Sequence, residues 1–138
     1  MKREIKFRGK RKDNGEWIYG YYVRDCENSL IIVIGEKALY NLHIPHQVIP
    51  ESVGQYTGLK DKNGKEIYIG DVVQDKYDIK GNPEIDTGRI DFINGCTCVT
   101  YFDLDEDEQR QYYPAYNGLK YYEVIGNVHE NPELIKEK

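Results

Sequence analysis

The stretch Gln55–Val73 reads Gln-Tyr-Thr-Gly-Leu-Lys-Asp-Lys-Asn-Gly-Lys-Glu-Ile-Tyr-Ile-Gly-Asp-Val-Val and carries the densest turn signals in the chain. Asn63 and Gly64 accept a positive φ at little steric cost, so they predict a tight hairpin turn, either primed or bulged. A run of β-formers follows until Gly70 and Asp71 break it. We interpret all four as structural turn residues, and we expect Asp71 to accept hydrogen bonds from nearby backbone amides.

A glycine-rich phosphate cradle is the alternative interpretation of this stretch. A phosphate-binding loop of that kind ends in Gly-Lys-Ser/Thr and leads directly into a helix. The stretch has neither the ending nor a helical pattern after it, so turn geometry is the favoured interpretation.

Similar turn signals recur at short intervals on both sides. Asp13-Asn14-Gly15 separates two strand-like segments and predicts a β-hairpin over residues 4–23. Asn94-Gly95 predicts a second hairpin between strands at 87–93 and 96–102. Short strands with close-set turns predict a mostly β fold, with one or two short helical turns.

A boundary is expected near residue 50, where prolines interrupt an irregular segment. It would separate an N-terminal β-hairpin unit, residues 1–50, from a small SH3-like C-terminal barrel, residues 51–138. The first unit is expected to serve oligomerisation or interaction. Within the barrel, Gly81-Asn82-Pro83 is expected to form a loop.

The return strand of the first hairpin is apolar on both sides. Period-two alternation places Trp17, Tyr19, Tyr21 and Val23 on one face and the intervening apolar residues on the other. We therefore expect cover on both faces, from the rest of the domain or from another subunit. The chain has 13 Tyr against 3 Phe and 1 Trp, a composition that suits thin β layers and subunit interfaces.

Charge is distributed unevenly along the chain. The net charge of −5 weighs against general nucleic-acid binding, which needs a basic face to displace counterions. Residues 1–12 are nevertheless basic, and Phe7 among them and Trp17 nearby could stack on bases. This segment is therefore the best nucleic-acid candidate. The favoured interpretation of this segment is nevertheless an edge strand that its charges protect from aggregation. Residues 103–118 form a long acidic segment, for which a solvated loop is the favoured interpretation and contact with a basic partner surface the functional alternative.

The candidate interaction surface combines the basic strand, the aromatic strand and the acidic segment. Its predicted members are Arg3, Lys6, Arg8, Trp17, Tyr19, Tyr22, Asp105, Asp107, Tyr112 and Tyr113. The partner is expected to be a second copy of the chain, or a host or phage protein. Nucleic acid is the partner that the net charge disfavours.

Metal and thiol chemistry have weak support. His43 and His46 are the only closely spaced histidine pair, and Pro45 between them spoils the helix that such spacing would need. Cys96 and Cys98 share one strand face without the second pair that a zinc site requires, so core packing is favoured. We predict no catalytic, cofactor-binding or metal-binding residue, no cofactor, and no enzymatic activity.

Three cysteines without a framework spacing indicate a reducing cytoplasm. No apolar segment follows the basic N-terminus, so no signal peptide is expected. The longest apolar run, Leu30–Ile34, is too short to span a membrane.

Six segments, in order along nearly the whole chain, resemble the YopX family: Arg3–Arg8, Gln55–Asp61, Asn63–Tyr68, Gly70–Val73, Glu123–Asn127 and Glu130–Leu134. The resemblance implies a mostly β fold, an oligomer, and an origin in phages or prophages of Gram-positive bacteria. It implies no activity and no catalytic residues. Together these observations predict a non-catalytic, protein-binding or oligomeric accessory protein in the host cytoplasm. The alternative is a nucleic-acid-associated small barrel that uses the basic N-terminal strand.

Overall fold

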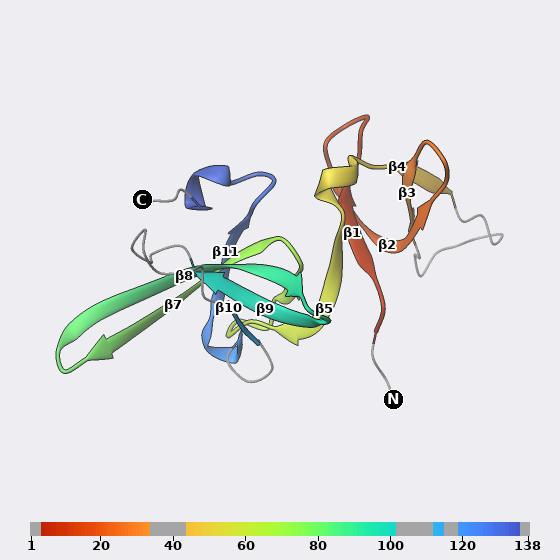
Figure 1. Ribbon diagram of the computed structural model, residues 1–138. Coiled ribbons are helices and arrows are strands. Elements are labelled where there is room, and N and C mark those ends of the chain that lie inside the picture. The colour runs from red at the N-terminus through yellow and green to blue at the C-terminus, as the bar shows by residue number, and fades with distance from the viewer. Residues whose placement is uncertain (1–3, 34–43, 102–111, 115–118, 136–138) are drawn as a thin grey trace. The chain divides into compact units, whose positions relative to one another are not determined.

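The computed structural model describes residues 4–33, 44–101, 112–114 and 119–135 (Figure 1). Of residues 112–114 it describes only the backbone. These residues are mostly β and form antiparallel sheets, which confirms the predicted fold class. The helices among them are 3-10 turns: η1 (Pro50–Ser52), η2 (Leu119–Tyr121) and η3 (Pro132–Ile135). The sequence predicts one or two short helical turns, and the described residues contain these three.

The chain divides into two compact units between Gly58 and Leu59. The division falls after the predicted boundary at residue 50 because strand β5 (Gly54–Lys60) begins beside β1, with Gln55 opposite Phe7. That pairing ties the first residues of β5 to the N-terminal unit. Whether each unit is a separate domain stays a prediction.

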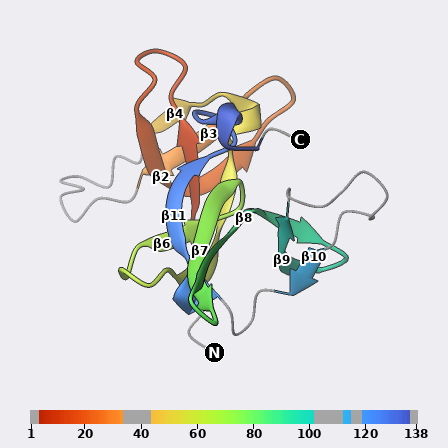
Figure 2. The ribbon, with the colours of Figure 1, turned by 90° about the vertical axis from the view of Figure 1, so that its left-hand side faces the viewer.

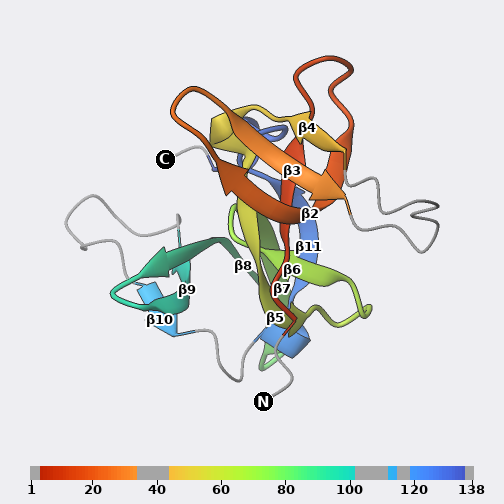
Figure 3. The ribbon, with the colours of Figure 1, turned by 90° about the vertical axis from the view of Figure 1, so that its right-hand side faces the viewer.

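The N-terminal unit contains β1 (Phe7–Lys10), β2 (Trp17–Arg24), β3 (Ser29–Val33) and β4 (Pro45–Gln47). Their antiparallel order is β4-β3-β2-β1, with β5 beyond β1. Figure 3 shows β4, β3 and β2 of this sheet next to one another. The β1–β2 hairpin confirms the one predicted over residues 4–23, and its turn contains Gly15 at φ 71°.

The core of the N-terminal unit is small. Ile31 and Val48 are fully buried, and Tyr56 is buried as well. Gly20 on β2 lies so close to the neighbouring strand that a Cβ there would overlap the carbonyl oxygen of Ile32. Glycine is therefore required at this position by close approach of two backbones, at an ordinary φ.

The C-terminal unit holds a five-stranded antiparallel sheet in the order β10-β9-β8-β7-β11 (Figure 2). Its strands are β7 (Asp71–Ile79), β8 (Asn82–Ile93), β9 (Cys96–Tyr101), β10 (Tyr112–Pro114) and β11 (Glu123–Asn127). The buried cluster comprises Ile67, Val73, Ile90, Val99, Leu119 and Tyr122. Strands β10 and β11 lie at opposite edges of this order, and closure into an SH3-like barrel stays a prediction.

The β8–β9 hairpin has the predicted turn. Asn94 and Gly95 both adopt positive φ, 51° and 80°, as a type I′ turn requires. Its strands pair from Gly88–Tyr101 to Ile93–Cys96.

The loop predicted at Gly81–Pro83 is wrong, because β7 and β8 form one continuous hairpin through this region. Lys80 and Gly81 have φ values of 51° and 87° and make a two-residue turn, while Pro83 pairs with Asp78 inside the ladder. Asp78 Oδ1 accepts a hydrogen bond from the Gly81 amide at 2.7 Å. This side-chain cap and the glycine together make the tight turn possible although lysine seldom adopts a positive φ.

Candidate interaction surfaces

The first candidate is the side of β2 that carries Trp17, Tyr19, Tyr21 and Val23, here called the aromatic face. Tyr19, Tyr21 and Val23 expose 48%, 54% and 42% of their surface. The expected cover on both sides of this strand is therefore incomplete in the described part of the chain. The register with β3 sets Ile32 opposite Tyr21 and so extends the same apolar surface.

The basic strand lies beside this face, and its cations stack on aromatic rings. The Lys6 ammonium lies 5.0 Å from the ring centre of Tyr56 and 3.2 Å from the Glu4 carboxylate. The Arg8 guanidinium lies 4.9 Å from the Trp17 ring centre, and Arg8 is 8% exposed. These cations are partly committed to their own sheet, which leaves less of their charge for an external ligand.

Tyr22 belongs to the opposite face of β2, as strand periodicity requires. Its ring lies 5.5 Å from that of Phe7, centre to centre, and its hydroxyl lies 3.2 Å from Ser29 Oγ. The structure thus brings Trp17 and Tyr19 together but separates Tyr22 from them. Tyr21 was omitted from the candidate residues although period-two alternation alone places it beside Tyr19.

Five residues of the predicted interaction surface have side chains outside the described part of the chain. Arg3, Asp105 and Asp107 lie outside the described residues. Tyr112 and Tyr113 belong to β10 and pair with Thr100 and Val99 of β9, and nothing is described of their side chains.

The predicted turn residues have the geometry expected of them. Gly64 and Gly70 have φ values of 80° and 94°. Asn63 is not among the described residues with positive φ, so the turn is the bulged rather than the primed form. Asp71 is 1% exposed and its Oδ2 accepts a hydrogen bond from the Tyr68 amide at 2.8 Å, which confirms its predicted role.

Asp61 is the residue of this stretch that sequence reasoning missed. Its Oδ1 accepts hydrogen bonds from the amides of Asn63 and Lys65, at 2.8 and 2.9 Å, and its Oδ2 accepts one from Val124 at 3.0 Å. Burial would raise the pKa of Asp61, but the hydrogen bonds from Val124, Lys65 and Asn63 outweigh it and lower that pKa. One buried carboxylate therefore joins the turn to strand β11.

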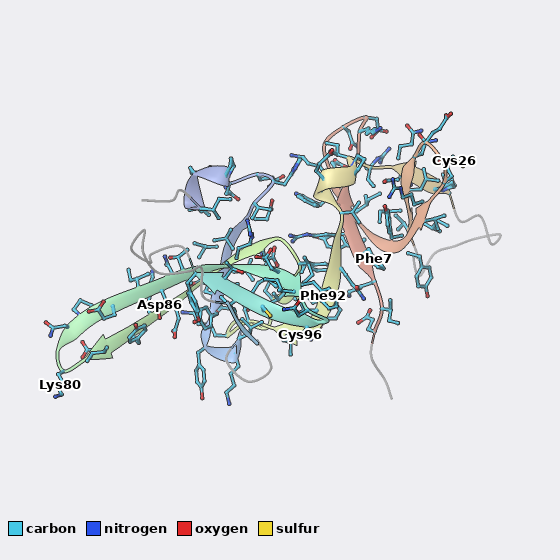
Figure 4. The ribbon with its side chains drawn as sticks, viewed as in Figure 1. Phe7, Cys26, Lys80, Asp86, Phe92 and Cys96 are labelled. Carbon is cyan, nitrogen blue, oxygen red and sulfur yellow. The ribbon has the colours of Figure 1, made fainter. Side chains whose placement is uncertain are left out.

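The second candidate surface is the distal part of the β7–β8 hairpin, residues Asp75–Asp86, here called the arm. Figure 1 shows it in green, extending away from the other strands of its sheet, with Lys80 at its tip in Figure 4. Tyr77, Ile79 and Ile85 are 38%, 52% and 51% exposed. A hydrogen bond to Asp86 raises the pKa of the Tyr77 hydroxyl.

Cys96, Cys98 and His46 are the thiol and histidine candidates that the structure describes. Cys96 and Cys98 lie with their sulfurs 3.3 Å apart, Cys98 fully buried, and burial raises the pKa of Cys98 to about 11. His43 lies outside the described residues, and His46 pairs with Ile31 in the β3–β4 ladder. Within the described ranges no group of three or more His, Cys, Asp or Glu side chains could hold a metal ion.

Fold and surfaces together define a small all-β protein with exposed apolar strands in each of its two units. The chain belongs to the YopX family, whose model, described as YopX protein, matches residues 6–136. The match covers nearly the whole chain and confirms the resemblance seen in the sequence.

The chain is also similar to a solved structure, the crystal structure of protein EF1440 from Enterococcus faecalis. The TM-score is 0.55 at 25% sequence identity, over 98% of this chain and 100% of that one. The name of that protein states no activity. No curated protein matches the chain significantly. Among the described residues, no helix has the length and apolar character needed to cross a membrane.

Proposed function

We propose that the chain is a non-catalytic module that works by protein–protein association, as an accessory protein of a phage or prophage in the cytoplasm of its bacterial host. The observation that carries this proposal is the exposed aromatic face of β2. Three large side chains, Tyr19, Tyr21 and Val23, project from one strand with about half of their surface open. Contiguous exposed apolar surface of this kind is typical of protein interaction sites, and tyrosine is enriched in them.

Tyrosine also suits the chemistry of such a contact. Its ring contributes a large apolar area at a low cost in side-chain entropy, and its hydroxyl stays satisfied by water when the surface is unoccupied. The Arg8 guanidinium lies 4.9 Å from the centre of the Trp17 ring, and a cation–π contact of this kind helps to hold the indole in place. A preorganised surface loses less entropy on association.

The proposal is tested by affinity capture from a lysogenic host, quantified for the wild type and for Tyr21→Ser. We expect the variant to lose most of the specifically captured partner protein, because the central ring of the face is gone. Tyr121→Ser is the matched control, since Tyr121 is a 61% exposed tyrosine on the 3-10 turn η2 of the C-terminal unit and does not belong to the aromatic face. Equal capture by the wild type and Tyr21→Ser would refute binding through this face.

A second candidate function, nucleic-acid association, is favoured by one observation. Lys6, Lys10 and the aromatic face share one side of the N-terminal sheet, so cations and rings are interleaved as in single-strand binding surfaces. This candidate predicts a mobility shift of single-stranded DNA at low salt that weakens in Lys6→Ala. Absence of any shift at low salt removes it.

A further inference from the structure

The strands of the arm have only each other as neighbours among the described strands. β11 pairs with β7 no further than Gln74, and β9 pairs with β8 only from Gly88 onward. No described strand therefore pairs with the outer edge of β7 from Asp75 to Ile79. A two-stranded hairpin on its own is marginally stable in water, and an open strand edge is a template for pairing with another strand.

The turn at the tip fixes which backbone groups point outward. Ile79 and Asn82 close the two-residue turn, and the closing pair of such a turn exchanges both of its hydrogen bonds. Because hydrogen-bonded and non-hydrogen-bonded pairs alternate along an antiparallel ladder, the backbone groups of Tyr77 face β8. The amide and carbonyl groups of Lys76 and Asp78 face outward from the edge.

We infer that two copies of the chain pair through this edge of β7, antiparallel, across a two-fold axis at Tyr77. The inference rests on the proposed function and specifies one of its contacts. Lys76 then lies opposite Asp78 of the partner subunit and exchanges both backbone hydrogen bonds with it, and the symmetry repeats the pair. Tyr77 lies opposite its own counterpart, at the closer spacing of a non-hydrogen-bonded pair.

Charge selects this register. An axis at Lys76 would set two lysines opposite each other, and an axis at Asp78 would set two aspartates opposite each other. Like charges directly opposite destabilise a strand pair, and opposite charges stabilise it. A two-fold interface must be self-complementary, and the order Lys76-Tyr77-Asp78 is self-complementary only about Tyr77.

The other edge of the arm is unsuited to the same contact. In the ladder, Pro83 pairs with Asp78, so the nitrogen of Pro83 faces outward and offers no hydrogen-bond donor there. A two-fold axis at Ile85 would moreover place Glu84 directly opposite Asp86 of the partner subunit, so that two negative charges would face each other. Association is therefore confined to β7, and a closed two-fold contact of this kind ends at two copies.

A charge exchange tests the inference directly. Sedimentation velocity at micromolar concentration is expected to show a wild-type dimer. Lys76→Glu alone sets like charges against each other twice in each dimer and keeps the hydrogen bond from the Gly81 amide to Asp78, so it is expected to weaken dimerisation at least about tenfold. Asp78→Lys has the same effect on charge but also removes that hydrogen bond, so Asp78→Ala, which removes the bond without reversing the charge, is its control and is expected to weaken dimerisation less. The double variant Lys76→Glu with Asp78→Lys restores opposite charges and is expected to dimerise at least as well as Asp78→Ala.

Lys80→Glu is the control, because it makes the same charge change in the turn of the same arm, outside the paired segment. It is expected to dimerise like the wild type. Far-ultraviolet circular dichroism of each variant verifies that the sheets are formed. A wild-type oligomer that neither single variant weakens, or a double variant that does not recover, overturns the β7 contact and leaves self-association itself in place. A wild type that stays monomeric overturns the contact as well, and capture through Tyr21 then decides the proposed function separately.

Discussion

The base and the arm of the β7–β8 hairpin share one ladder but not one environment. At the base, Val72, Val73 and Ile90 are fully buried. In the arm, Tyr77 and Ile85 of the same two strands are 38% and 51% exposed. Strand pairing is continuous across both parts, so pairing alone does not decide what a strand residue contributes. Burial decides this contribution. The buried side chains of the base stabilise the fold, and the exposed side chains of the arm are available for contacts with other molecules.

The largest effect is expected at the base. Ile90→Ala removes a fully buried side chain from the C-terminal core and leaves a cavity, so it should cost about 2–5 kcal/mol of unfolding free energy. Urea denaturation followed by far-ultraviolet circular dichroism measures the loss. A loss below about 1 kcal/mol would show that the base does not carry the stability of this unit.

Asp61 supports the base from its flank, through β11. Asp61→Ala leaves the amides of Asn63, Lys65 and Val124 without this acceptor, and we expect a loss of about 1–3 kcal/mol in the same assay. Asp61→Asn is the control, because its single side-chain oxygen keeps part of the contacts. An intermediate loss for Asp61→Asn is expected, and equal stability of wild type and Asp61→Ala would contradict the role of this carboxylate.

The same carboxylate predicts a pH dependence. Folding lowers the pKa of Asp61 below its ordinary value of 3.8, so its stabilising contribution is present above about pH 4. It is lost as the pH falls from there through the folded-state pKa. Stability measured against pH should therefore decline more steeply in acid for the wild type than for Asp61→Asn. Parallel curves for the two proteins would contradict the lowered pKa.

The smallest effect is expected in the arm. Ile85→Ala changes a side chain that is 51% exposed, and its unfolding free energy should stay within about 0.5 kcal/mol of the wild type. The measurement is made at low protein concentration, where association contributes little to apparent stability. A loss comparable to that of Ile90→Ala would abolish the distinction between base and arm.

Turns were the most predictable part of this fold. Asn94-Gly95 and Asp13-Asn14-Gly15 were recognisable because few residues tolerate a positive φ, so their presence locates a reversal. Lys80-Gly81 makes the same kind of turn, but the sequence predicted a loop there. Lysine does not indicate a positive φ, and Pro83 indicates a loop more often than a strand.

The surfaces were less predictable, because they depend on contacts between distant residues. Alternation correctly grouped Trp17 with Tyr19 and Tyr21, but it does not say which face another element covers. The hydrogen bond from the Val124 amide to Asp61 joins residues 63 positions apart, and no local sequence pattern predicts it. The open edge of β7 likewise follows from where β11 begins, at Glu123, and not from the residues of β7 itself.

The stacking of Arg8 on Trp17 has a practical consequence for spectroscopy. Trp17 is the only tryptophan in the chain, and it lies in the N-terminal unit. Its fluorescence, sensitive to the cation above the ring, reports on that unit alone, whereas the far-ultraviolet signal arises from the strands of both units. Coincident denaturation curves from the two probes would mean that the units melt as one cooperative system, and separated curves would give each unit a midpoint of its own.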